Sequence, residues 1–191
     1  MHIINHQNRK TMYPTLFHFS DDNAIKRFVP RPLAVPSPRR AGMEWLNSPL
    51  VWAIDAWHQP MYLFPRECPR ILLWCKDMTT KRDRDLYFGA SDAQILAYVE
   101  SAWLPKIESQ TLYRYQLPTD TFQSLEDAGM WVSKAAVTPT KMEPMSELTT
   151  RLRIHRVELR VVNTLTSLKD VWNTSLHASG IRLRNAADWY V

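Results

Sequence analysis

The sequence predicts an α+β fold of roughly six to eight short strands with short helices between them. Short apolar runs recur along the chain between turn-forming residues, which is the pattern of short strands. Helical patterns are few and do not alternate regularly with the strands, so a repeated strand–helix–strand architecture is not expected. The chain has 191 residues, 45% of them hydrophobic, which is enough for one core. We therefore expect a single domain over residues 1–191.

The first 44 residues predict an arm, a strand and a loop. Residues 1–13 have no periodicity and no apolar face, and we expect a loose arm there. Leu16–Ser20 is an aromatic run suited to a strand, and the Ser-Asp-Asp-Asn cluster that ends it predicts the N-cap of a short helix over 24–28. Residues 29–44 are rich in proline and arginine, which predicts an extended loop outside any sheet interior.

Two buried strands are expected in the middle of the chain. Val51–Ile54 and Arg70–Cys75 are apolar runs that are typical of strands covered on both faces. Between them, residues 57–64 predict one or two helical turns, because Pro60 suits a helix start and Pro65 ends the helix.

The second half of the chain continues the mixture of short elements. Residues 79–85 are charged and expected to be solvated, while 91–100 fits a helix and a strand equally. Residues 111–117 alternate in period two, which predicts a strand with one wet face. Further strands are expected over 131–133, 137–142, 157–162 and 181–184, and helices over 146–154 and 165–176.

Glycine is scarce, and this scarcity excludes several nucleotide-binding motifs. The chain has four glycines, of which the closest two, Gly89 and Gly129, are 40 residues apart. A loop that cradles phosphate with backbone N–H groups needs several glycines within a few residues. A Rossmann fingerprint, a P-loop and a kinase glycine-rich loop are therefore excluded. No group of His and Cys has metal-ligand spacing, so no metal site is expected.

The net charge of +5 lies mostly near the N-terminus. Residues 1–44 hold seven basic and three acidic residues, which is a net +4. A local positive field attracts the phosphates of a nucleotide or of nucleic acid, although only Tyr113-Arg114-Tyr115 interleaves aromatic and basic residues as a nucleic-acid surface would. The same charges equally fit a solvated loop.

The spacing of the two cysteines and the hydropathy of the chain predict the cellular compartment of the protein. Cys68 and Cys75 are too widely spaced for a Cys-x-x-Cys motif and fit free thiols in a reduced cytosol. The polar start lacks the apolar region of a signal peptide, and no apolar run of about 18 residues occurs. We expect a soluble cytoplasmic protein with no membrane partner; its oligomeric state does not follow from the sequence.

Three groups of residues are suited to chemistry. His18 and Ser20 share one face of the first strand and can offer hydrogen bonds to a sugar or phosphate, although His18 also fits a core histidine bonded to backbone. Asp55 and His58 are close enough for a carboxylate-oriented imidazole if a helix begins there, and Asp55 equally fits an N-cap.

The third group is a pair of arginines around an acidic residue. Arg66 and Arg70 flank Glu67 directly after the aromatic helical turn. Two guanidinium groups at this spacing can hold a phosphate, and an ion-paired turn is the alternative.

Several motifs together resemble an uncharacterised bacterial family, a domain of unknown function. The resemblance implies no activity. The segments that carry it are His18-Phe19-Ser20-Asp21-Asp22, Phe28-Val29-Pro30-Arg31, Val51-Trp52-Ala53-Ile54-Asp55, Tyr62-Leu63-Phe64-Pro65-Arg66, Cys68-Pro69-Arg70, Tyr113-Arg114-Tyr115 and Leu183-Arg184-Asn185-Ala186.

A second resemblance is to the ADP-ribosyltransferase superfamily of the His-Tyr-Glu type. There a histidine holds the nicotinamide ribose, a tyrosine stacks on the nicotinamide, and a glutamate stabilises an oxocarbenium-like transition state. The first two motifs are matched by His18 with Ser20 and by Trp52-Ala53 with Tyr62. The third is matched by Met130-Trp131-Val132-Ser133.

This second resemblance implies a fold, a ligand and site residues. The fold would be two split, mixed or antiparallel sheets with short flanking helices. The ligand would be NAD, as substrate, or a related nucleotide or small molecule in a cleft between the sheets. His18 and Tyr62 would be catalytic, Ser20, Trp52 and Ala53 would bind ligand, and Arg31 or Arg66 would meet its phosphates.

The chain departs from this superfamily at Met130, which stands where the glutamate is expected. A thioether cannot stabilise a cation at the anomeric carbon as a carboxylate does. Transfer would then need Glu126 or Asp127 from upstream, and nucleotide binding without transfer is the simpler expectation. The alternative is a non-enzymatic interaction protein that holds an acidic or nucleic-acid partner on a basic surface formed by Arg31, Arg39 and Arg40.

Overall fold

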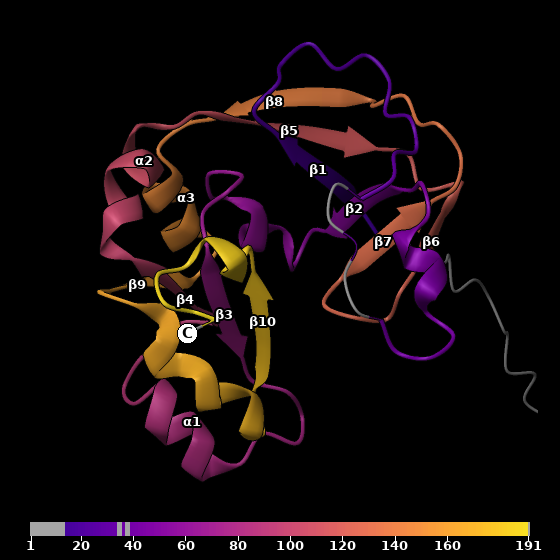
Figure 1. Ribbon diagram of the computed structural model, residues 1–191. Coiled ribbons are helices and arrows are strands. Elements are labelled where there is room, and N and C mark those ends of the chain that lie inside the picture. Colours follow the sequence, from indigo (N-terminus) through magenta and orange to yellow (C-terminus); the bar gives the residue numbers. More distant parts are fainter. Residues whose placement is uncertain (1–13, 34–35, 37–38, 191) are drawn as a thin grey trace, which may run out of the picture.

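Two β-sheets form the framework of the computed structural model, which describes residues 14–33, 36 and 39–190 (Figure 1). All neighbouring strands of the six-stranded sheet are antiparallel. Its strands are, in spatial order, β6 (Phe122–Ser124), β7 (Met130–Ser133), β2 (Val51–Asp55), β1 (Leu16–Ser20), β5 (Leu112–Leu117) and β8 (Lys141–Met145). The prediction of an α+β fold with mixed and antiparallel sheets is confirmed.

The second sheet has four strands and one parallel pair. Its spatial order is β10 (His177–Ile181), β3 (Arg70–Trp74), β4 (Ile95–Glu100) and β9 (Val157–Val162). Only β4 and β9 run parallel. β3 and β4 are buried along their whole length, which explains why both read as continuous apolar runs rather than alternating ones.

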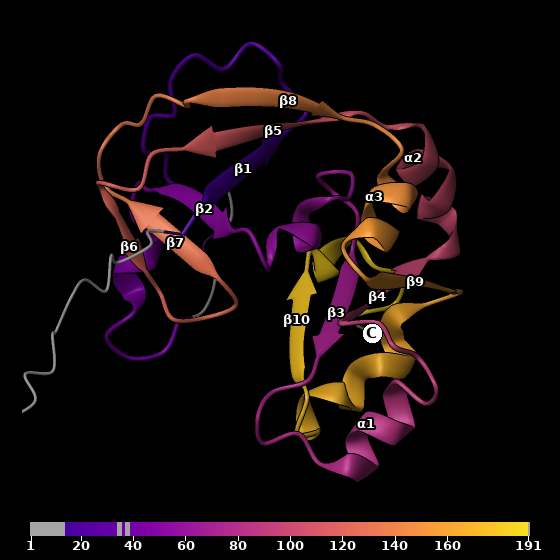
Figure 2. The same cartoon turned by 180° about the vertical axis from the view of Figure 1, so that it is seen from behind.

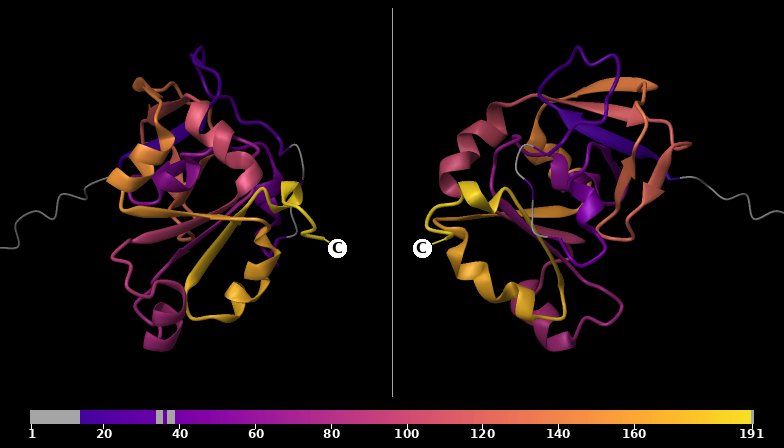
Figure 3. Two further views of the ribbon diagram at one scale, coloured as in Figure 1. Left: turned by 90° about the vertical axis from the view of Figure 1, so that its left-hand side faces the viewer. Right: turned by 45° about the vertical axis from the view of Figure 1, so that its right-hand side comes forward.

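Short helices cover the ends and the outer face of this framework. Figures 2 and 3 show α2 and α3 at one end, where the two sheets approach each other, and α1 at the far end of the four-stranded sheet. The α-helices are α1 (Lys81–Tyr87), α2 (Leu104–Ser109) and α3 (Leu148–Ile154). The 3-10 helices are η1 (Glu44–Asn47), η2 (Gln59–Tyr62), η3 (Ser101–Trp103), η4 (Leu165–Asn173) and η5 (Leu183–Asn185).

The main core lies between the two sheets. Phe17 and Ile54 enter it from the six-stranded sheet, Leu72 and Ala97 from the four-stranded sheet, and Leu152 from α3. These side chains are all buried, and their removal from water is the main force that holds one sheet against the other. A second cluster, between the opposite face of the four-stranded sheet and η4, covers the outside of that sheet.

The helix predicted over 24–28 is wrong, because side chains close tight turns there instead. The backbone N–H of Asp22 donates to Oγ of Ser20 at 3.1 Å, and that of Ala24 donates to Oδ1 of Asp22 at 2.8 Å. The Tyr115 hydroxyl donates to the Asp22 carbonyl at 2.7 Å and accepts from the N–H of Ile25 at 3.3 Å. The N–H of Phe28 donates to the Val137 carbonyl at 2.7 Å instead of to the carbonyl four residues earlier, so the segment does not close a helical turn.

Other expectations differ in smaller ways. Residues 79–85, expected to be charged and solvated, lie largely in the exposed helix α1, which the Thr80 hydroxyl caps by accepting from the N–H of Asp83. The strand predicted over 181–184 lies earlier, because β10 covers His177–Ile181 and the chain then turns into η5. The strand predicted over 137–142 lies later, as β8, and β6 was not predicted because its three residues carry no apolar run.

Some of the expected features fall outside what the structure describes. The arm predicted over 1–13 and part of the loop predicted over 29–44, residues 34–35 and 37–38, lie outside the described residues. Within the described residues, no helix combines the length and the apolar composition needed to cross a membrane.

Candidate functional site

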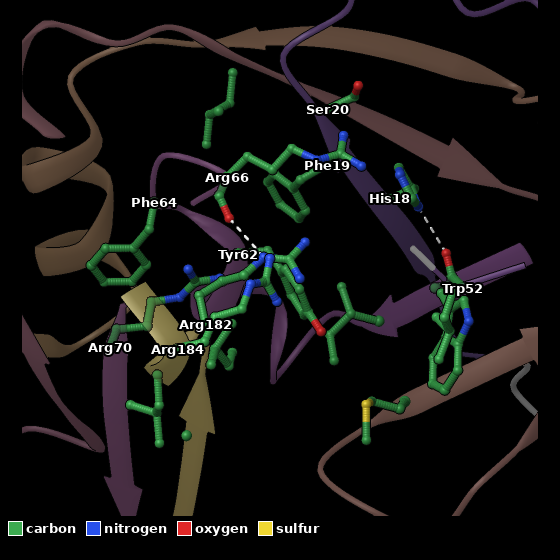
Figure 4. Close-up of a pocket in the computed structure, with 18 of the residues that line it drawn as sticks. His18, Phe19, Ser20, Trp52, Tyr62, Phe64, Arg66, Arg70, Arg182 and Arg184 are labelled. Carbon is green, nitrogen blue, oxygen red and sulfur yellow. Dashed lines mark hydrogen bonds between the residues drawn. The ribbon is translucent and has the colours of Figure 1, made fainter. Parts of the chain in front are cut away.

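A pocket of about 660 Å³ lies where the two sheets meet (Figure 4). This volume falls within the range of small-molecule sites. The six-stranded sheet contributes residues of β1, β2 and β7, and the four-stranded sheet contributes Arg70 of β3 and the end of β10. The segment after β10 forms one wall, with Arg182, Arg184 and Tyr190. The lining is mostly aromatic and basic.

His18 is positioned where β1 and β2 separate. The two strands pair only at Leu16 with Asp55 and at Phe17 with Ile54. Beyond that point Nδ1 of His18 lies 2.8 Å from the backbone oxygen of Trp52. Because a carbonyl only accepts, Nδ1 carries the proton and donates it, which leaves Nε2 as an acceptor. Burial lowers the pKa of His18, so the ring is neutral at neutral pH.

Ser20 lies two residues after His18 and lines the same pocket. Its side chain is almost fully buried, and its Oγ accepts the N–H of Asp22 at 3.1 Å. A hydroxyl that accepts one hydrogen bond still has its own proton to donate. His18 and Ser20 both line the pocket, and each keeps one unused hydrogen-bonding group, an acceptor at Nε2 and the hydroxyl proton.

Tyr62 ends η2 and forms part of the pocket on the side away from Trp52 (Figure 4). Its ring is nearly parallel to that of Phe19, with the centroids 6.5 Å apart and an angle of 16° between the planes. The Arg70 guanidinium carbon lies 5.7 Å from the centroid of the Tyr62 ring. Burial raises the pKa of Tyr62, so its phenol is protonated at neutral pH. The residue offers a flat aromatic face and a hydroxyl.

Arginine side chains dominate the polar part of the lining. Arg66, Arg70, Arg182 and Arg184 are seen together in Figure 4 on the Tyr62 side, and Arg66 extends from there toward Ser20 and His18. The positive charge of Arg66 contributes to the lowered pKa of His18, after burial. Arg39 adds a fifth guanidinium, 5.8 Å from the centroid of the Trp52 ring. The pocket is therefore suited to an anionic ligand with a flat ring.

Most of the residues predicted for the site line this one pocket, and one does not. The pocket brings together His18, Ser20, Trp52, Ala53, Tyr62 and Arg66. Arg31 is not among its lining residues; it is exposed and pairs with Leu50 in an isolated β-bridge. Met130 lines the pocket, whereas Glu126 and Asp127 do not.

Sequence reasoning missed the contribution of Arg182 and Arg184. Nη2 of Arg184 lies 3.0 Å from Oε2 of Glu67, and Nε of Arg182 lies 3.5 Å from Oε1 of the same carboxylate. Asn185 donates from Nδ2 to the Glu67 carbonyl at 2.7 Å, which ties the segment after β10 to the turn before β3. The motif Leu183-Arg184-Asn185-Ala186 was visible in the sequence, but no local pattern placed it beside Glu67.

Asp55 and His58 form a contact outside this pocket. Both carboxylate oxygens of Asp55 approach Nδ1 of His58, at 2.9 and 3.0 Å, and Oδ1 also accepts the His58 backbone N–H at 2.8 Å. Asp55 thus closes the turn before η2 and contacts the imidazole, but it is not the N-cap of η2, which is His58. Trp57 and Trp74 pack edge-on against the imidazole, and neither Asp55 nor His58 lines the pocket.

Comparison with known proteins places the chain in a family. Residues 17–186 match a family of unknown function (DUF6886). The chain belongs to this family. The matched residues run from β1 to η5, and we call them the DUF6886 domain. They include His18, Tyr62, Arg70 and Arg184 but not Tyr190. No curated protein and no solved structure matches the chain.

The DUF6886 domain offers no cluster of metal ligands in its described part. Among residues 14–33, 36 and 39–190, no group of three or more His, Cys, Asp or Glu side chains is arranged to hold a metal ion. The groups that the DUF6886 pocket does provide are cationic, aromatic and hydroxyl groups, which bind anions, rings and sugars.

Proposed function

We propose that the pocket binds an anionic nucleotide, with NAD as the first candidate, and that it does so without transferring ADP-ribose. The observation that carries this proposal is that His18 and Tyr62, which come from different elements, line the same pocket. The resemblance to the ADP-ribosyltransferase superfamily includes the same two residues, and it suggests a nicotinamide nucleotide as the ligand. The lining chemistry supports each part of such a ligand.

The sugar would be recognised by His18 and Ser20. The neutral imidazole has an acceptor at Nε2, since Nδ1 donates to the Trp52 carbonyl at 2.8 Å. A ribose hydroxyl can donate to that nitrogen and accept from Oγ of Ser20. A protonated imidazole would lack the acceptor, so the lowered pKa of His18 favours this contact at neutral pH.

The planar ring of the ligand would pack on Tyr62. The near-parallel ring of Phe19 extends the flat surface beside it, and Trp52 adds apolar area across the pocket. Aromatic stacking of this kind accepts a base or a nicotinamide, because each has a π face. Arg66, which lies between the two sides of the pocket, would meet a phosphate.

The carboxylates present do not favour glycosyl transfer. Asp21 is the one carboxylate among the described lining residues, and its Oδ1 accepts from Nε2 of Gln110 at 3.1 Å. Met130, which the resemblance aligns with the glutamate of the superfamily, lines the pocket. Without a carboxylate at that position, the pocket lacks the group that would stabilise an oxocarbenium-like transition state. Binding without transfer is therefore the function that the pocket supports best.

A thermal-shift screen with nucleotides tests this proposal. NAD or a related nucleotide should raise the melting temperature, because a ligand that binds only the folded state stabilises it. His18→Ala and Tyr62→Ala should remove that rise, while His155→Ala, which changes a histidine outside the pocket, should keep it. The wild type should release no nicotinamide from NAD. Unaltered shifts in His18→Ala and Tyr62→Ala would reject the assignment.

The alternative function uses the basic surface near the N-terminus instead of the pocket. Arg31 and Arg40 are exposed and outside the pocket, so they are free of the nucleotide contacts proposed above. An acidic or nucleic-acid partner held there would bind in a salt-dependent way. The double variant Arg31→Gln, Arg40→Gln would then weaken the partner interaction, and His18→Ala would not.

A further inference from the structure

We infer that the Tyr62 side of the pocket is a diphosphate subsite, in which the buried guanidinium of Arg70 and the two arginines after β10 hold the phosphates of the ligand. This inference rests on the proposed function and deepens it, because it specifies the anionic part of the ligand. It also assigns a binding role to Arg182 and Arg184. Three observations carry it.

The first observation is that Arg70 is buried without a carboxylate. The residue is only 2% exposed. Nε donates to the Met61 carbonyl at 2.7 Å, and Nη1 donates to the Cys68 carbonyl at 2.8 Å. No Asp or Glu oxygen among the described residues lies within 4.0 Å of its guanidinium nitrogens. Burial lowers the pKa of Arg70 to about 10, so the guanidinium remains charged at neutral pH.

A buried cation without an anionic partner is costly. Moving a charged group out of water is unfavourable unless an opposite charge or hydrogen bonds offset the lost hydration. Two backbone carbonyls and the rings of Tyr62 and Phe64, whose centroids lie 5.7 and 5.1 Å from the guanidinium carbon, supply only part of that compensation. An anionic ligand in the pocket would supply the remainder.

The second observation is that one nitrogen of Arg70 is available to such a ligand. Nη2 has no hydrogen-bond partner among the described residues. It is also not one of the unpartnered side-chain nitrogens that are sealed from the surface, which are Nε1 of Trp52 and Nε of Arg114. Because Arg70 lines the pocket, this nitrogen is the one that we infer donates to a phosphate oxygen bound there.

The third observation is the charge balance of this side of the pocket. Four guanidinium groups and one carboxylate leave a net charge of +3, from Arg66, Arg70, Arg182 and Arg184 against Glu67. A single phosphate monoester carries only about −1.5 to −2 at neutral pH. Arg182 and Arg184 share Glu67, and each still has donors that the carboxylate does not use. The excess charge therefore favours a ligand with two phosphates over one with a single phosphate.

The geometry also separates this subsite from the sugar contacts. His18 and Ser20 lie on β1, across the pocket from Arg70 and from the segment after β10 (Figure 4). A diphosphate held by the arginines of the Tyr62 side would leave His18 and Ser20 for the sugar next to it and Trp52 for the base beyond. The ring that packs on Tyr62 would then be the one at the other end of a dinucleotide such as NAD. A nucleoside diphosphate has this order of parts, with charge at one end and the sugar next to it, and so does the ADP half of NAD.

Calorimetric titration with ADP, AMP, adenosine and inorganic pyrophosphate, without divalent cations, tests the inference. We expect affinity to fall at least tenfold from ADP to AMP and again from AMP to adenosine. Arg184→Gln and Arg182→Gln should each weaken ADP about tenfold and leave adenosine unchanged. Arg70→Lys should weaken ADP as well, since an ammonium cannot keep both carbonyl contacts and reach the ligand. Arg82→Gln, an exposed arginine on α1, is the matched control and should change nothing.

The outcomes separate this inference from the proposed function. The wild type could bind pyrophosphate but no nucleotide, with pyrophosphate binding lost in Arg184→Gln. That result would support the diphosphate subsite and reject nucleotide binding. The wild type could bind ADP and AMP with equal affinity, with neither affinity changed in Arg182→Gln or Arg184→Gln. That result would support nucleotide binding and overturn the diphosphate subsite. If Arg70→Lys fails to fold, Arg182→Gln and Arg184→Gln still decide between the outcomes. Preference for a 5′-phosphorylated oligonucleotide over ADP would also overturn the inference, since it commits to a small nucleotide.

Discussion

His18 donates its Nδ1–H to the carbonyl oxygen of Trp52 over 2.8 Å, at the place where β1 and β2 stop pairing. The imidazole thus satisfies a carbonyl of β2 that lies beyond the paired part of β1 and β2. The same hydrogen bond fixes the tautomer, so Nε2 is the acceptor that remains for a ligand. This hydrogen bond therefore connects the point where β1 and β2 stop pairing with the tautomer of a histidine that lines the pocket.

This contact predicts a specific pH dependence of stability. The pKa of His18 is lowered by burial, so the unfolded chain binds a proton there more readily than the folded chain. Stability should therefore fall as the pH drops through the unfolded value of about 6.5. His18→Gln should be about 1 kcal/mol less stable at pH 8 and lose part of this slope. Urea denaturation at several pH values measures both. His155 and His177 also have lowered pKa values. An equal pH dependence of stability in the wild type and in His18→Gln would therefore assign the effect to those two histidines.

Glu143 should stabilise the fold against acid. Lys141 and Arg114 each lie 2.6 Å from its carboxylate, and these contacts lower the pKa of Glu143 to about 2. Because the folded pKa is below the unfolded one, this contribution is present at neutral pH and is lost as the pH falls from about 4.5 toward about 2. Glu143→Gln should be less stable at pH 7 and lose less stability in acid, as followed by circular dichroism. Glu108→Gln, an exposed control on α2, should keep the wild-type acid profile.

Gly129 should tolerate no side chain. A Cβ there would lie 2.1 Å from Nδ1 of His58 and 2.6 Å from Oδ2 of Asp55, and the backbone has φ +66°. Gly129→Ala must therefore displace the Asp55–His58 contact and should cost about 3 kcal/mol. Gly89→Ala is the matched control, because φ is +54° there but the nearest atom is 3.9 Å away. It should cost only about 1 kcal/mol from backbone strain. Equal denaturation midpoints for the two variants would show that the clash is relieved.

The two cysteines should differ sharply in reactivity. Cys75 is exposed, whereas Cys68 is fully buried and burial raises the pKa of its thiol to about 11. The thiolate is the reactive form, so a disulfide reagent should label one thiol in the native protein and the second only in denaturant. Cys75→Ser should abolish the native reaction. Rapid labelling that persists in Cys75→Ser would mean that the turn containing Cys68 opens in solution.

The parts of the fold that local patterns determine could be predicted from the sequence. The strands over 16–20 and 157–162 were predicted with their observed bounds, because aromatic and β-branched runs there are bounded by turn residues. The helix over 24–28 was wrong because Tyr115, distant in the sequence, binds the backbone of that segment. Helix α2 was not predicted, since its six residues contain only one buried position, Ile107.

The candidate site could likewise be predicted only in part from the sequence. The motifs that contain His18 and Tyr62 could be recognised in the sequence, and the structure brings these two residues to one pocket. The approach of Arg184 to Glu67 joins residues 117 positions apart and depends on the pairing of β10 with β3. Arg31 was expected near the phosphates because it lies in a basic segment, but its bridge to Leu50 holds it elsewhere. Charge density in a sequence does not show which face of the fold a side chain reaches.

The most direct measurement is calorimetric titration of NAD into the wild type, His18→Ala and His155→Ala. The expected result is saturable binding with one site per chain in the wild type and in His155→Ala, and loss of that binding in His18→Ala. The lost contact alone is worth about 1 to 3 kcal/mol, or up to roughly a hundredfold in affinity. Absence of binding to the wild type for NAD, ADP and AMP alike, or wild-type affinity in His18→Ala, would contradict it.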